Sequence, residues 1–157
     1  MRAAIFVRVA PDDFEPGIEY QALEADIPRV GAICTFVGLV RDVGDRRHRT
    51  DVRGLTLEHY PGMTERAIEG IAEEAAQRWS ADRIRVVHRV GSLGAGERIV
   101  FVGVSSAHRQ DAYAACEFIM DYLKTQAPFW KKEWSDTGSH WVEQKESDRD
   151  RARRWEP

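Results

Sequence analysis

The sequence predicts an α+β fold, a single domain over residues 1–157 with a mixed, largely antiparallel sheet and flanking helices. Strand-like and helix-like segments follow one another without the regular strand–helix–strand alternation of a doubly wound sheet. Several predicted strands are separated by short turns that contain glycine or proline, which favours antiparallel connections. A length of 157 residues is enough for one hydrophobic core.

The N-terminal third is predicted to contain two strands, a helix and a loop. Residues 3–9 (AAIFVRV) are rich in β-branched and aromatic side chains, which favours a strand. Residues 15–26 carry apolar residues at helical spacing and predict a short helix. Residues 30–40 (VGAICTFVGLV) predict a second strand, in which Gly38 indicates a bulge or a close backbone approach. Residues 41–54 are polar, charged and without periodicity, and predict a mobile loop.

The middle of the chain is predicted to add two strands and a helix. Residues 55–60 (LTLEHY) alternate as a strand does, and Pro61-Gly62 indicates a turn. Residues 64–79 have an apolar stripe at helical spacing, and residues 83–90 (RIRVVHRV) alternate between basic and apolar side chains. The glycine-rich residues 91–97 lack the sequence context of a phosphate-binding loop, so they are interpreted as a hairpin connection.

A buried strand and a long helix are predicted next. The strand is the apolar run at residues 98–104. Ser105 and Ser106 are predicted to cap the helix, and Pro128 prevents it from continuing because proline lacks an N–H group. The buried face of this helix is predicted from apolar residues at helical spacing, namely Ala112, Cys116, Ile119, Met120 and Leu123.

The C-terminal part is predicted to be a closing hairpin followed by a tail. Residues 129–134 and 139–142 are its strands, around a turn at residues 136–138. Three tryptophans in this segment suggest a packed surface or an interface. The highly charged residues 143–157 predict a mobile tail or a segment that docks on a partner.

Composition excludes several classes of protein. The net charge of −3 argues against a general attraction to nucleic acid or to an anionic membrane. No apolar run approaches the roughly 20 residues that span a bilayer. The N-terminal residues do not resemble a secretory signal, and a cytoplasmic location is expected.

A set of basic side chains at the ends of predicted elements is the strongest sign of a functional site. His108 and Arg109 lie where a strand gives way to a helix, and a helix N-terminus already attracts anions. Lys124 lies in the last turns of that helix, Lys131 follows its end, and Arg41 ends the second strand. A lysine close to other cations has a lowered pKa, which suits proton transfer or nucleophilic work. The spacing therefore predicts a site for an anionic ligand.

Metal and thiol chemistry are not predicted. No two histidines have the H-x-x-x-H spacing, and neither cysteine belongs to a C-x-x-C motif. Cys34 and Cys116 lie in apolar segments and are interpreted as reduced core residues, because a reactive thiol needs exposure and a cationic neighbour.

Four long runs, in order along the chain, resemble the large, catalytic subunits of molybdopterin synthase, the MoaE family. They are LTLEHYPGMTE (residues 55–65), VVHRVGSLGAGE (86–97), FVGVSSAHR (101–109) and FIMDYLKTQAPFWKKE (118–133). The likeness extends from about residue 20 to residue 148, which is most of the chain.

This resemblance implies a function in molybdenum cofactor biosynthesis. Members of the family convert cyclic pyranopterin monophosphate, or precursor Z, into molybdopterin by inserting two sulfurs as a dithiolene. The sulfur comes from a thiocarboxylate on the C-terminal Gly-Gly of a small ubiquitin-like subunit. The resemblance also implies a hammerhead-type α+β fold, a homodimer within a heterotetramer, and no metal or organic cofactor.

The family's site residues correspond to particular positions here. The resemblance implies catalytic roles for Lys124 and Lys131. Lys124 would orient the thiocarboxylate or protonate a leaving oxygen, and Lys131 would be a second acid or an anion anchor. Leu39 stands where some members have a lysine, and with Val40 it is a weaker candidate. The substrate-binding residues implied are Arg41, His108, Arg109, Lys124, Lys131, Lys132 and Glu133.

Two other classes of function stay open at this point. A non-catalytic scaffold could bind an anionic partner tail through the same cations. A nucleic-acid module could use Arg46, Arg47 and Arg49, although the net charge and the lack of a binding motif argue against it.

Overall fold

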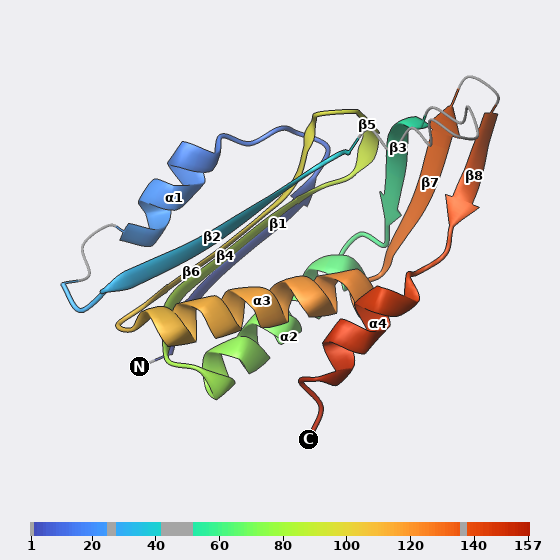
Figure 1. The fold of residues 1–157 in the computed structure, drawn as a ribbon. Coiled ribbons are helices and arrows are strands. Elements are labelled where there is room, and N and C mark those ends of the chain that lie inside the picture. Colours follow the sequence, from blue (N-terminus) through green and yellow to red (C-terminus); the bar gives the residue numbers. More distant parts are fainter. Residues whose placement is uncertain (1, 25–27, 42–51, 136–137) are drawn as a thin grey trace.

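The computed structural model describes residues 2–24, 28–41, 52–135 and 138–157, and shows two sheets with helices packed around the first (Figure 1). In the first sheet the strand order is β1-β4-β6-β2. The β1–β4 pair is parallel, and the β4–β6 and β6–β2 pairs are antiparallel. Its strands are β1 (Ala4–Ala10), β4 (Ala81–Arg89), β6 (Arg98–Ser106) and β2 (Ala32–Leu39).

The second sheet has the strand order β5-β3-β7-β8, and all its pairs are antiparallel. The predicted closing hairpin forms its β7–β8 edge. The α+β class and the mixed, largely antiparallel pairing are therefore confirmed, with the strands divided between two sheets. Its strands are β5 (Gly91–Gly94), β3 (Val52–His59), β7 (Phe129–Ser135) and β8 (Gly138–Val142).

The helices cover both faces of the first sheet (Figure 1). Helices α2 and α3 lie on one face, and α1 lies on the other, where Leu23 packs with Val87 and Phe101. Helix α4 lies beside the C-terminal half of α3. The helices are α1 (Pro16–Glu24), α2 (Met63–Arg78), α3 (Arg109–Thr125) and α4 (Glu146–Arg153).

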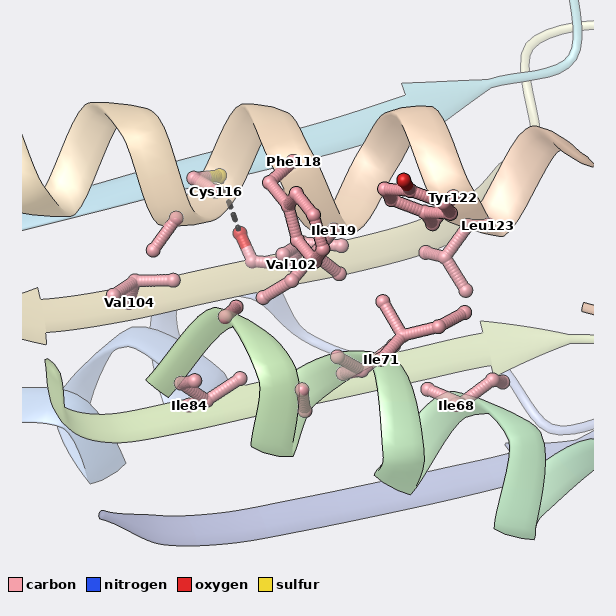
Figure 2. Close-up of a cluster of buried hydrophobic side chains, with 14 of the residues drawn as sticks. Ile68, Ile71, Ile84, Val102, Val104, Cys116, Phe118, Ile119, Tyr122 and Leu123 are labelled. Atoms are coloured by element: carbon pink, nitrogen blue, oxygen red, sulfur yellow. Dashed lines mark hydrogen bonds between the residues drawn. The ribbon is translucent and has the colours of Figure 1, made fainter. Parts of the chain in front are cut away.

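Successive side chains of β6 point to opposite faces of the sheet, which explains why its apolar residues are consecutive. Val102 and Val104 face α2 and α3 in the main core (Figure 2). Phe101 faces α1 on the other side of the sheet. A strand covered on both faces needs apolar residues at successive positions. Gly103 lies on the α1 face, where a Cβ atom would collide with the Leu23 side chain, so only glycine allows α1 to approach this closely.

The helix start differs from the prediction. Ser105 and Ser106 belong to β6 and are buried, and His108 is the N-cap of α3. The Ser106 hydroxyl donates to the Ser80 carbonyl at 2.6 Å, and the Ser105 hydroxyl accepts from the Arg83 N–H at 3.1 Å. These hydroxyls satisfy backbone groups beside the neighbouring strand, so they are not available to cap a helix.

Strand β5 lies within the glycine-rich segment that was interpreted only as a connection. Its residues 91–94 pair with β3 from Leu57 to Gly54. Gly54 itself lies in β3, so this strand begins earlier than the predicted loop 41–54 allowed, and residues 42–51 lie outside the described residues. A Cβ atom at Gly54 would collide with the Trp134 ring and the Leu93 carbonyl, so close packing explains a glycine within a strand.

The charged C-terminal segment folds onto its own chain. Ala152 of α4 is 7% exposed, and the Trp155 ring packs edge-on against Trp79 and Phe118. The sequence predicted a mobile tail or a segment bound to a partner. The highly charged composition did not indicate a packed helix. Only two apolar residues, Ala152 and Trp155, attach α4 to an aromatic cluster formed by other elements.

We predict that Phe118→Ala lowers the free energy of unfolding by about 3–5 kcal/mol, because it leaves a cavity beneath α3. Phe118 is fully buried and contacts three other aromatic rings. The matched control is Tyr113→Ala on the same helix, where the side chain is 63% exposed and the change should stay within about 0.5 kcal/mol. Equal losses in urea unfolding would contradict this description of the core.

Candidate functional site

Helix α3 separates two groups of predicted site residues. His108 and Arg109 are exposed at its start, and Lys124 lies in its last turn. Arg109 and Lys124 are fifteen positions apart, which corresponds to about 22 Å along a helix axis. One copy of the chain therefore does not bring the His108–Arg109 pair together with Lys124.

Arg41 lies at the same end of the first sheet as Lys124. Strands β2 and β6 run antiparallel, with Leu39 opposite Arg98 and Ala32 opposite Ser106. Helix α3 follows the Ser106 end of β6 and runs back along the sheet, so its C-terminus lies near the end where β2 finishes (Figure 1). Arg41 is exposed just beyond β2.

The two weaker candidates before Arg41 have different surroundings. Leu39 is 54% exposed, whereas Val40 is 3% exposed and packs in the core beneath the second sheet. The Val40 N–H donates to the Glu97 carbonyl at 2.8 Å, and the Val40 carbonyl accepts from the Gly96 N–H at 2.7 Å. Val40 therefore fixes the backbone from which Arg41 projects, and its side chain is not accessible to a ligand.

Lys124 reaches the surface, but protein atoms crowd around its ammonium group. Desolvation by these atoms is the largest cause of a pKa below the ordinary lysine value. The charge of Asp148 opposes this shift, and the charges of Lys131 and Lys145 add to it. The side chain is exposed, and among the described residues none hydrogen-bonds the ammonium.

The pleat of β7 divides the three charged residues that follow Pro128. Lys131 and Glu133 share one face, with Lys131 Nζ 3.7 Å from a Glu133 carboxylate oxygen. Lys132 points to the opposite face, where its ammonium lies 5.2 Å from the centre of the Trp141 ring. The structure therefore places Lys131, with Glu133 as its ion-pair partner, close enough for its charge to act on Lys124, and leaves Lys132 on a separate face.

His88 is a neighbour of Lys124 that sequence reasoning did not select. It is buried, its ring is stacked on Phe129 at 4.0 Å between centroids, and its Nδ1 lies 2.7 Å from the Arg89 carbonyl. Burial is the main reason that the His88 pKa falls to about 4, and the charges of Lys124 and His59 lower it further. The ring is therefore neutral at pH 7 and forms an uncharged wall beside Lys124.

A signal for this position exists in the sequence. In RIRVVHRV, His88 has the same strand parity as Ile84 and Val86, the residues that face the main core. A histidine that faces the core must be kept neutral by its surroundings, or its charge must be paired with an opposite charge.

The two cysteines, Cys34 of β2 and Cys116 of α3, meet in the main core. Their thiols are hydrogen-bonded to each other, which lowers the Cys34 pKa to about 7 and, together with burial, raises that of Cys116. Cys116 Sγ also lies 3.9 Å from the Val102 carbonyl oxygen. Both thiols are free, and Cys116 lies midway along α3, so the pair belongs to neither charged end of the helix.

A cavity of about 980 Å³ opens near the start of α3. Among the described residues that line it, none is a predicted site residue, although Ala107 borders it next to His108. Arg29 and Asp82 of its lining form an ion pair at 2.7 Å. The cavity is therefore at the other end of the sheet from Lys124.

The described part of the chain contains neither a metal-binding cluster nor a membrane-spanning helix. Within the described ranges, no three His, Cys, Asp or Glu side chains are grouped so that they could hold a metal ion. No helix in these ranges is both long and apolar enough to cross a membrane.

Comparison with known proteins identifies the family. The family model described as "MoaE protein" matches residues 9–126. The chain belongs to the MoaE family. It is 55% identical over 150 residues to the molybdopterin synthase catalytic subunit of Pseudomonas aeruginosa, covering 96% of this chain and 98% of that one. It is 52% identical over 149 residues to the subunit of the same name from Escherichia coli, covering 94% and 95%.

Solved structures share the fold of this MoaE family member. The molybdopterin biosynthesis MoaE protein of Burkholderia ambifaria superposes with a TM-score of 0.80 at 46% identity, covering 99% of this chain and 98% of that one. The molybdopterin synthase of Staphylococcus aureus gives a TM-score of 0.77 at 30% identity, covering 87% and 96%. These matches confirm the resemblance inferred from the four sequence runs.

We predict that acid destabilises the protein through His88. Its pKa is about 4 when folded and 6.5 when unfolded, so the stabilisation from keeping it neutral is complete above pH 6.5 and declines as the pH falls toward 4. The full difference corresponds to about 3 kcal/mol. Urea unfolding at pH 7 and pH 4.5 should show a smaller acid loss in His88→Gln than in the wild type.

The control for this experiment is His140→Gln. His140 is exposed at the edge strand β8, so its replacement should leave the acid loss unchanged. An acid loss in His88→Gln as large as in the wild type would show that His88 is not the responsible group.

Proposed function

We propose that this MoaE family member is the catalytic subunit of molybdopterin synthase, a cytoplasmic sulfurtransferase that converts cyclic pyranopterin monophosphate into molybdopterin. Near-full-length identity of about half to catalytic subunits of that name supports the family activity. The observation that carries the chemistry is the Lys124 ammonium, which is desolvated, unpaired among the described residues and close to Lys131. Such a group suits an anionic sulfur donor.

The sulfur donor in this proposal is the thiocarboxylate at the C-terminal Gly-Gly of a small ubiquitin-like subunit. Its sulfur attacks a side-chain carbon of the pterin, so that a C–S bond forms and the C–O bond to the leaving oxygen breaks. The sulfur is then still joined to the glycine carbonyl as a thioester. Water hydrolyses this acyl C–S bond, which leaves the sulfur on the pterin and a carboxylate on the small subunit. Lys124 binds the thiocarboxylate and donates a proton to the leaving oxygen. Lys131 is the second anion anchor, and Glu133 at 3.7 Å holds it in position. No side-chain thiol is required, because the partner supplies the sulfur.

The cyclic phosphate needs fixed cations, and Arg41, His108 and Arg109 are proposed to bind it. Since about 22 Å of helix separates Arg109 from Lys124, both cannot serve one substrate within one chain. We therefore propose that a second copy in a homodimer contributes its His108–Arg109 pair to the Lys124 site. With a small subunit at each end, this dimer forms a heterotetramer.

We predict that Lys124→Ala reduces molybdopterin formation by at least about 100-fold, because it removes the proton donor and the anion anchor together. The assay mixes the purified chain with thiocarboxylated small subunit and pterin precursor, and measures dithiolene product. Arg153→Ala is the control, since it removes an exposed cation from α4. Wild-type turnover by Lys124→Ala would remove this residue from the mechanism, and tail binding without turnover by the wild type would support a scaffold.

We predict that two inactive variants complement each other in mixed dimers. Lys124→Ala and a His108→Ala/Arg109→Ala double variant are unfolded together, refolded and assayed. If sites are shared between copies, activity should recover to about a quarter of the wild-type value, since half of the dimers hold one intact site. Absence of recovery in dimers shown to be mixed would place each site within one chain.

A further inference from the structure

The C-terminal segment is fastened along α3 at two points. At the first, the Gln144 side-chain amide donates to the Lys124 carbonyl oxygen at 2.9 Å. At the second, a single Asp121 oxygen accepts from the Trp155 indole N–H at 2.7 Å and from the Arg154 guanidinium at 2.9 Å. Helix α4 connects these two points, and Figure 1 shows it beside the C-terminal half of α3.

Trp155 is the main anchor of this segment. Its ring lies edge-on to Trp79 at 5.3 Å and to Phe118 at 5.7 Å, and its carbonyl accepts from Arg78 Nη1 at 2.7 Å. Asp121 is 8% exposed, so its carboxylate would be left without compensation if the indole and guanidinium donors were withdrawn. The anchor is therefore specific in both shape and hydrogen bonding.

The hydrogen bond from Gln144 to the Lys124 carbonyl is supported by a second residue of the C-terminal segment. The Arg149 guanidinium donates to the Gln144 side-chain and backbone carbonyl oxygens, both at 3.1 Å. This bracing fixes the start of α4 beside the last turn of α3. Asp148, in the first turn of α4, is half-buried and lies four residues after Gln144, which is hydrogen-bonded to the Lys124 carbonyl.

The charges that act on Lys124 come from several elements. Lys131 of β7 and Lys145 at the N-cap of α4 repel its ammonium, and Asp148 of α4 attracts it. His88 of β4 faces the same region but is neutral at pH 7. Asp148 therefore offsets part of the effect of the two lysines and of desolvation, and the Lys124 pKa stays below the ordinary lysine value.

We propose that Asp148 is a positioning residue for Lys124, held in place by the Trp155–Asp121 anchor, and that together they keep the Lys124 ammonium charged and ready for the anionic sulfur donor. The role of Asp148 toward the sulfur donor rests on the proposed function. The electrostatic effect of Asp148 and Trp155 on Lys124 can be measured without turnover.

The experiment titrates Lys124 directly in the full-length chain. The sequence contains four lysines, at positions 124, 131, 132 and 145, so a protein labelled with ¹³C-lysine gives few side-chain signals, and Lys124→Arg assigns the one of interest. Asp148→Asn should shift the Lys124 titration to lower pH. Asp148→Glu should restore it, and Asp150→Asn, which removes a charge from the same helix where Asp150 pairs with Arg153, should leave it unchanged.

Trp155→Phe tests the anchor, because it keeps an aromatic ring and removes the N–H donor to Asp121. A shift in the direction of Asp148→Asn supports the anchor, whereas a wild-type titration overturns it. Equal titrations for Asp148→Asn and Asp150→Asn overturn the role of Asp148.

The synthase assay distinguishes a failure of the proposed function from a failure of the electrostatic role of Asp148. With the thiocarboxylated small subunit, Asp148→Asn should move the loss of activity at alkaline pH to lower pH, and Asp148→Glu should restore the profile. An inactive wild-type chain whose Lys124 still responds to Asp148 would refute the proposed function and leave the electrostatic inference intact. An active chain whose Lys124 ignores Asp148 would do the reverse.

Discussion

The packing of α3 against β6 is the constraint on which the rest of the structure depends. Phe118 and Ile119 are fully buried against a strand that is itself covered on both faces, which holds a straight helix of 17 residues along the first sheet. The helix keeps His108 and Lys124 at opposite ends, as a rigid rod does. One copy of the chain therefore cannot supply both groups to a single small-molecule site.

The second sheet supplies the other half of the Lys124 region. Antiparallel pairing of β7 with β3 orients Lys131 and Glu133 toward one face, and the pleat sends Lys132 to the other. Phe129 at the start of β7 stacks on His88, so the two sheets are joined at the place where the lysines gather. Burial keeps His88 neutral, and this limits the positive charge concentrated around Lys124.

The C-terminal segment shows how a highly charged sequence can be structural. Its helix α4 has little apolar surface of its own, and its position depends on the Trp79 and Phe118 rings and on the buried Asp121 carboxylate. These partners lie more than thirty positions earlier in the chain. A tail that composition alone describes as mobile is thereby brought next to the proposed catalytic lysine.

The sequence by itself determined the α+β class, most strands and helices, and the family, because alternation and helical spacing are local and the four long runs are specific. It also identified Arg41 and Lys124 as cations at the ends of elements, and Lys131 as a cation beyond the end of the long helix. Only the tertiary structure decided which of them share a region, because that depends on strand pairing, pleat and helix direction. Spacing along the chain carries no information on the 22 Å, estimated from the helical rise, that separates Arg109 from Lys124, or on the contact between Trp155 and Asp121.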